Sequence, residues 1–143
     1  MTNKLNLYDS AYLALFDGTM DWDGMANVAA VLCESAYTPD AAAHTSYSHL
    51  TNISATADKV AVTGRATNLV SGQIRYTADK ISFGAEVSIS GQYIALVAGD
   101  PANLQASDPL IGWIDLGETK TSENAEFSAT PAAEGLFRIS KAA

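Results

Sequence analysis

The sequence predicts a mainly β protein: a single domain spanning residues 1–143, with a β-sandwich or jelly-roll-like arrangement and a short N-terminal α-helix. Beyond residue 24, apolar residues either alternate with polar ones or form short continuous runs, which is typical of strands. Turn-forming Gly, Pro, Asn and Asp separate these runs at intervals of roughly ten residues. About seven to nine short strands at this spacing favour a sandwich or jelly roll over an alternating α/β fold.

The predicted helix spans residues 5–17. Its apolar residues recur at spacings of three and four and would form one stripe, made of Leu5, Tyr8, Tyr12, Leu15 and Phe16. Asn3 or Asn6 is expected to cap its start, Asp9 suits the first turn, and Gly18 provides a left-handed end. The stripe requires a cover, either the sheet of its own domain or a neighbouring subunit.

Strands are expected from about residue 26 onward. Residues 26–33 and 93–97 are apolar on both faces, which predicts buried central strands. Shorter strands are expected at 60–64, 74–76, 81–83, 87–89, 110–116, 125–129 and 136–139. Residues 38–50 form a polar connection in which Pro39 favours a short helix.

The net charge of −8 argues against direct binding of nucleic acid, because the eight basic residues are scattered singly and form no positive patch. The N-terminus lacks a charged segment followed by an apolar run, so no signal peptide is expected. No apolar stretch has the length that a membrane span needs, so no membrane partner is expected either.

No metal site or cofactor is expected. In Asp17–Gly24 the acids fall at positions 1, 5 and 7, and Val28 stands where an EF-hand carries Glu, so a helix-to-strand turn explains the segment better than calcium. His44 and His49 lack further ligands at zinc spacing. Cys33, the only cysteine, lies in an apolar run and is interpreted as a small buried residue.

Catalytic motifs are also lacking. The chain has no Gly-x-Ser-x-Gly nucleophile elbow and no glycine-rich phosphate loop. Pairs of carboxylates will arise by chance among 16 acids, so their presence decides nothing about glycoside cleavage. No catalytic residue is assigned, and the chain is expected not to be an enzyme.

Several aromatic residues suggest a partner interface instead. The residues assigned to the core are Trp22, Trp113, Phe83, Phe127 and Phe137, whereas tyrosines in polar connections can anchor a protein interface or stack on sugars. The candidate interface consists of Leu5, Tyr8, Tyr12, Tyr37 and Tyr47.

Three segments, taken together, carry a resemblance to a known family. They are Met20-Asp21-Trp22-Asp23, Tyr37-Thr38-Pro39-Asp40, and the run Pro109-Leu110-Ile111-Gly112-Trp113-Ile114-Asp115-Leu116-Gly117. In this order and spacing the chain resembles a family of small β-rich virion structural proteins of tailed bacteriophages, associated with heads or tails. The resemblance implies a short N-terminal helix, an Asp-Trp turn, and strands that end in an Ile-Asp-Phe/Leu-Gly corner.

The resemblance implies a structural function in the virion. We expect a decoration (cement) protein that binds and stabilises the outer capsid shell, made in the host cytoplasm, with the major capsid protein or other virion proteins as partners. A homo-oligomer is expected, and a trimer would be natural at local threefold positions. The alternatives are a neck, tail or fibre component, or a glycan-binding module of the particle. A small hydrolase is the third and least supported hypothesis.

Overall fold

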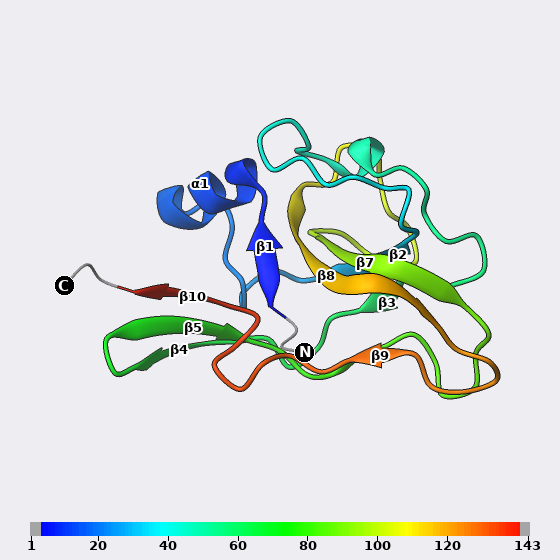
Figure 1. The fold of residues 1–143 in the computed structure, drawn as a ribbon. Coiled ribbons are helices and arrows are strands. Elements are labelled where there is room, and N and C mark those ends of the chain that lie inside the picture. The colour runs from blue at the N-terminus through cyan, green and yellow to red at the C-terminus, as the bar shows by residue number, and fades with distance from the viewer. Residues whose placement is uncertain (1–3, 141–143) are drawn as a thin grey trace.

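A computed structural model describes residues 4–140 and is mainly β, with one α-helix near the N-terminus (Figure 1). A five-stranded sheet has the order β1-β8-β7-β2-β3, a three-stranded sheet the order β10-β5-β4, and β6 pairs with β9. Every pair is antiparallel. The elements are β1 (Leu5–Leu7), α1 (Asp9–Asp17), β2 (Ala29–Cys33), the 3₁₀-helix η1 (Tyr47–His49), β3 (Val60–Ala61), β4 (Ala66–Val70), β5 (Gln73–Thr77), β6 (Ile81–Ser82), β7 (Ser90–Val97), β8 (Leu110–Thr121), β9 (Ser128–Ala129) and β10 (Phe137–Ser140).

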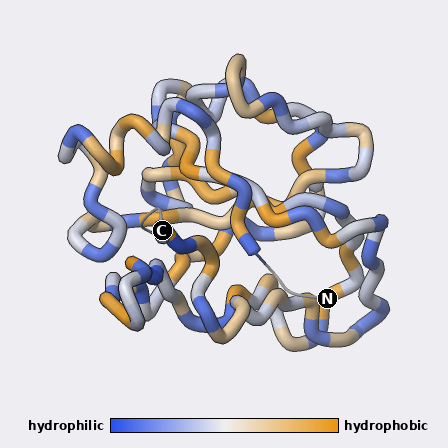
Figure 2. Tube along the Cα trace, turned by 60° about the vertical axis from the view of Figure 1, so that its left-hand side comes forward, coloured by the Kyte–Doolittle hydropathy of each residue, from blue (hydrophilic) through white to orange (hydrophobic). Residues whose placement is uncertain are grey.

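The five-stranded sheet is covered on both faces, which explains the continuous apolar runs of β2 and β7. All five residues of β2 are buried. One face packs Leu32 and Ile94 against side chains of the smaller sheets, including Phe137. The other face packs Val31, Cys33, Ala95 and Val97 under Tyr37, Leu50 and Leu104, which come from long connections. Figure 2 shows the apolar residues concentrated in the central strands and the polar residues in the loops.

The helix begins later than the sequence predicts. Residues 5–7 form β1 instead, because Leu5 pairs with Ile114 of β8 and the Leu5 amide donates to the Leu136 carbonyl at 2.6 Å. The predicted cap was therefore wrong for Asn6, which lies in β1, and Asn3 lies outside the described residues. Asp9 in the first turn and Gly18 as a left-handed end (φ +82°) are confirmed.

Most expected strands are present, although β2 covers only Ala29–Cys33 of the predicted 26–33 and β9 only Ser128–Ala129 of the predicted 125–129. Three further differences concern other segments. The strand at 87–89 is reduced to an isolated bridge between Val87 and Ala125. The short helix after Pro39 was a wrong prediction: Asp40 Oδ1 instead accepts the amides of Ala42 and Ala43 in a turn, and a 3₁₀-helix follows at Tyr47–His49. β4 was not predicted and pairs with β5 in a hairpin.

Gly112 allows β1 to lie close to β8, and this contact gives a stability prediction. A Cβ at Gly112 would lie 2.3 Å from the backbone oxygen of Asn6, which cannot swing aside as a side chain would. We therefore expect Gly112→Ala to lower the free energy of unfolding in urea by about 2–3 kcal/mol. The control is Gly72→Ala, where a Cβ meets nothing within 4 Å and only the positive φ costs about 1 kcal/mol. Equal losses in the two variants would contradict the steric argument.

Candidate functional site

Two tyrosines of the candidate interface are core residues that form a hydrogen-bonded cluster with a histidine. The hydroxyls of Tyr8 and Tyr37 lie 2.6 Å apart, and the Tyr37 hydroxyl lies 2.9 Å from His44 Nδ1. His44 Nδ1 also accepts the Asp40 amide at 3.2 Å, so this nitrogen is the acceptor and Tyr37 donates to it. The Tyr8 ring packs on Trp113 of β8, with ring centroids 4.8 Å apart. This cluster attaches the connection after β2 to the five-stranded sheet.

Burial determines the electrostatics of this cluster. It raises the pKa of Tyr8 well above its usual range, and the hydrogen bond with Tyr37 adds to the shift. Burial also raises the pKa of Tyr37, although the hydrogen bond from Tyr8 opposes this. On the same face of the sheet, burial raises the pKa of the Cys33 thiol to about 12. A thiol held in its neutral form is a poor nucleophile, so Cys33 acts as a packing residue.

The two histidines are stacked, with ring centroids 5.8 Å apart. His49 Nδ1 accepts the Thr45 amide at 3.0 Å, just as His44 Nδ1 accepts the amide of Asp40. Both Nδ1 lone pairs are therefore used by the backbone of the loop. Within residues 4–140, no three His, Cys, Asp or Glu side chains are grouped so that they could hold a metal ion.

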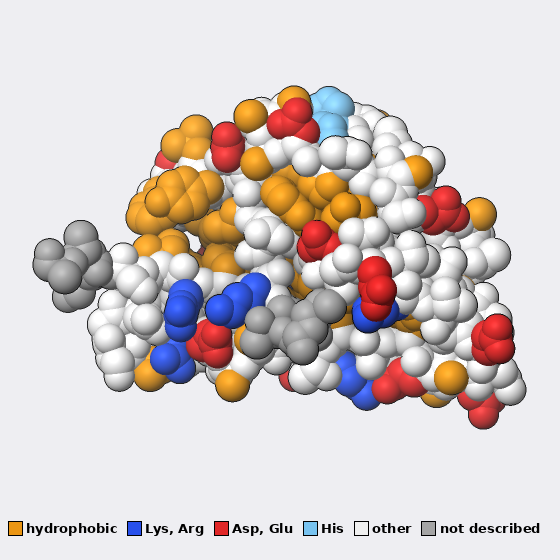
Figure 3. Space-filling view, in the orientation of Figure 1, with side chains coloured by type: hydrophobic (Ala, Val, Ile, Leu, Met, Phe, Trp, Pro, Cys, Tyr) orange, Lys and Arg blue, Asp and Glu red, His pale blue; other side chains and the backbone are white. Residues whose placement is uncertain are grey.

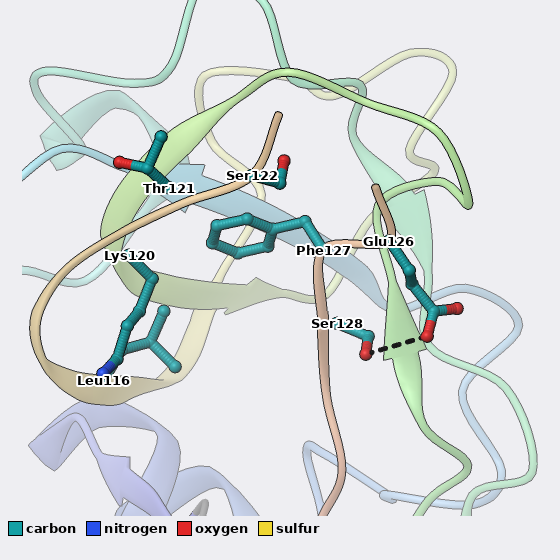
Figure 4. A pocket seen from close by; sticks show the side chains of 7 residues that line it. All are labelled: Leu116, Lys120, Thr121, Ser122, Glu126, Phe127 and Ser128. Carbon is teal, nitrogen blue, oxygen red and sulfur yellow. Dashed lines mark hydrogen bonds between the residues drawn. The ribbon is translucent and has the colours of Figure 1, made fainter. Parts of the chain in front are cut away.

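A pocket of about 330 Å³ lies where β8 ends, and Figure 4 shows the side chains that line it. The buried side chains of Leu116 and Phe127 contribute apolar surface, and Lys120, Glu126 and Ser128 contribute polar groups. The Ser122 hydroxyl, also part of this lining, donates to the Val87 carbonyl at 2.7 Å.

The pocket does not carry an acid–base pair. Among residues 4–140, Glu126 is the only carboxylate in its lining. Lys80 donates to both carboxylate oxygens at 3.0 and 3.1 Å and holds the pKa of Glu126 below its usual range. The carboxyl groups of Asp17 and Glu134 also have lowered pKa values, because Thr19 and Lys4 respectively donate hydrogen bonds to them. A general acid in a glycosidase needs the opposite shift, toward a raised pKa.

The exposed apolar surface of α1 is the feature of the described structure best suited to contact a partner. Tyr12, Leu13 and Phe16 are 54%, 65% and 60% exposed and lie on the outer side of the helix, whereas Ala11 is buried. The Tyr12 and Phe16 rings pack together with centroids 5.2 Å apart. We call these three residues the α1 patch; apolar side chains are prominent on the surface over α1 in Figure 3.

The structure separates the five residues of the candidate interface. Leu5, Tyr8 and Tyr37 are buried within the protein's own core and cannot contact a partner in this conformation. Tyr47 is the first residue of η1 and is half-buried, and among the five only Tyr12 is exposed. Sequence reasoning missed Leu13, although the small residues Ala11 and Ala14 indicated which side of the helix packs closely and therefore which side is left exposed.

Comparisons of the chain with protein-family models, with curated proteins and with solved structures found no match. Among residues 4–140, no helix combines the length and apolar character needed to cross a bilayer.

Proposed function

We propose that this protein is a structural component of a tailed-phage virion that binds the outer surface of the capsid shell as a decoration protein. The α1 patch is the observation that carries the proposal, because three large apolar side chains on one short helix suit the core of a protein interface. The resemblance described above supplies the virion context. The partner would be the major capsid protein or another virion protein.

The charge of the chain supports an outer position on the particle. A net charge of −8 disfavours contact with packaged DNA, whereas an apolar patch can dock on a protein shell despite that charge. Many copies, each with a modest contact area, would together stabilise the shell as homo-oligomers, and trimers would suit threefold positions. We further propose that the five-stranded sheet and the smaller sheets are the two layers of a β-sandwich, because they share one apolar cluster.

The proposal is tested by adding the purified protein to capsids of its own phage that were assembled without it. We expect saturable co-sedimentation at hundreds of sites per particle and a raised capsid melting temperature. The double variant Leu13→Ser/Phe16→Ser should bind at least about tenfold more weakly, because each lost apolar side chain removes more than about 1 kcal/mol of burial.

The matched control is Asn103→Ser/Gln105→Ser, which changes two exposed residues on the connection before β8 and should bind as the wild type does. Lack of binding to the shell by the wild type would overturn the decoration function. Binding that both double variants weaken equally would overturn the assignment of the α1 patch.

A glycan-binding function is the second candidate, favoured by the exposed Tyr12–Phe16 ring pair, since sugar rings stack on such aromatic faces. It would place the protein in the neck, tail or fibre of the particle. A glycan array separates the two candidates: the wild type should bind a defined sugar, and Tyr12→Ser should abolish that signal. A blank array would eliminate this candidate.

A further inference from the structure

The edge strand β4 is exposed and lacks the features that usually prevent strands from pairing between molecules. It is the end strand of the order β10-β5-β4. Natural edge strands are protected by charged side chains, prolines or bulges. The sequence Ala-Thr-Asn-Leu-Val has no charge and no proline, and its pairing with β5 is continuous over all five residues. Leu69 is 76% exposed, more than any other large apolar side chain among residues 4–140.

The hairpin geometry determines which backbone groups of β4 face outward. Ser71 (φ +49°) and Gly72 (φ +78°) form a two-residue turn, so the flanking pair Val70–Gln73 is hydrogen-bonded, and so are alternate pairs beyond it. The Tyr76 carbonyl accepts the Leu136 amide at 2.9 Å and thus points away from β4.

The residue opposite Tyr76, Thr67, therefore directs its own amide and carbonyl away from β5, and Leu69, two residues on, does the same. In the part of the chain that the structure describes, no backbone hydrogen bond joins either residue to another segment.

We propose that β4 of a second copy of this chain pairs antiparallel with β4, with Asn68 at the centre of symmetry. The two residues with outward backbone groups, Thr67 and Leu69, lie symmetrically about Asn68. Thr67 of each copy would then face Leu69 of the other, and both pairs would be of the hydrogen-bonded kind. The proposal rests on the homo-oligomer of the proposed function and makes it a twofold dimer in place of a trimer, because this self-complementary contact joins two copies.

The side chains of β4 suit this pairing. Leu69 pairs with Ile74 and Ile74 with Ile139, so these three residues form one apolar row across the small sheet. In the dimer this row continues onto the second copy, whose Thr67 and Tyr76 would cover the exposed side of Leu69. Asn68 would face the same residue of the second copy, and an amide can both donate to and accept from another amide.

The charges near this edge do not oppose a second copy. Two molecules that each carry −8 repel, but β4 brings no charged side chain to the contact. The nearest charge in the Asn68 row is Arg75 on β5. The Arg75 residues of the two copies would be three strand spacings apart, about 14 Å. This separation exceeds the Debye length of about 8 Å at physiological salt, so their repulsion is largely screened.

Cross-linking tests the register directly. The two Asn68 residues would form a pair without backbone hydrogen bonds, with Cα atoms about 4.5 Å apart, which is within the range for a disulfide. We expect Asn68→Cys to give a covalent dimer under mild oxidation. The control, Ser71→Cys, lies on the same hairpin but about 20 Å from its counterpart in this register, and should stay monomeric on a non-reducing gel. Native Cys33 is fully buried and should not contribute. Equal cross-linking of both variants, or none of either, would overturn the register.

Sedimentation equilibrium of the purified protein tests the association itself. The wild type should show a monomer–dimer equilibrium. Thr67→Pro, which removes one outward-facing amide, should weaken dimerisation at least about tenfold. Thr67→Val keeps the amide and the branched side chain and should dimerise like the wild type. A wild type that is monomeric at millimolar concentration would overturn the proposal. Because no capsid is involved, that result would leave the virion function untouched.

Discussion

Replacing Arg65 by Met is expected to destabilise the fold by about 3–4 kcal/mol, because one guanidinium satisfies three backbone carbonyls. Arg65 donates to the Val62 carbonyl at 3.2 Å, to the Met25 carbonyl at 2.6 Å and to the Trp22 carbonyl. Its guanidinium carbon also lies 6.0 Å from the centre of the Trp22 ring. Met keeps an unbranched apolar stem and leaves the three carbonyls without this donor. For a chain of this size the melting temperature should fall by about 10 °C.

The segment that Arg65 holds explains why the effect should be large. Trp22 is 1% exposed, its indole N–H donates to the Thr77 carbonyl at 3.0 Å, and its ring packs edge-on against Phe137. Arg65 thus connects the turn after α1 to the segment that leads into β4. Arg65→Lys should recover less than half of the loss, since a single ammonium cannot reach three carbonyls arranged around a planar fork.

Arg75→Met is the matched control for Arg65→Met. Arg75 is half-buried like Arg65, but among residues 4–140 its side chain donates only to Gln73 Oε1, at 3.3 and 3.4 Å. Its replacement should change the free energy of unfolding by less than about 0.5 kcal/mol. Urea unfolding of all variants at one protein concentration provides the comparison. If Arg65→Met costs no more than Arg75→Met, the three carbonyls do not depend on Arg65.

The central strands could be predicted from the sequence because burial on both faces leaves an unmistakable run of apolar residues. Of the predicted segments 26–33 and 93–97, residues 29–33 and the whole of 93–97 are strands. The N-terminal segment was ambiguous, because Leu5 and Leu7 also fit the apolar–polar alternation of a strand. Pairing with β8 makes this segment a strand. β4 escaped prediction because Asn68 is a poor strand former; the two-residue turn at Ser71 and Gly72 imposes the pairing.

The candidate interface was harder to predict, because tertiary contacts determine which aromatic residues are exposed. Tyr8 was placed on the apolar stripe of the predicted helix and Tyr37 beside a polar connection, but their hydroxyls satisfy each other in the interior. Sequence periodicity does not reveal such a pairing between residues 29 positions apart. The virion context of the proposed function rests on the resemblance. The α1 patch could be identified only from the structure, which shows the side of the helix that the sheet leaves uncovered.

Raising the pH above 9 is expected to destabilise the protein by up to about 4 kcal/mol through Cys33 alone. The thiol has an ordinary pKa of 9.0, which burial raises to about 12 in the folded state. Below pH 9 the thiol is protonated in both the folded and the unfolded state, so it adds no pH dependence to the stability. Between pH 9 and 12 the unfolded chain loses the proton more readily than the folded one, and stability therefore falls as the pH rises. Tyr8 and Tyr37, whose pKa values are also raised from 10.0, act in the same direction from about pH 10 upward.

Cys33→Ala separates the thiol from every other group that titrates in this range. The variant should lose about 1–2 kcal/mol at pH 7.5, because it leaves a small cavity beside the buried strand β7. Its stability should then stay nearly constant up to pH 10, where the wild type has already begun to decline. Urea unfolding at pH 7.5, 9, 10 and 11 measures both slopes. Parallel curves for the two proteins would mean that Cys33 ionises equally readily in the folded and unfolded states. The packing around β2 would then fail to exclude water from the thiol, in contradiction to the structure.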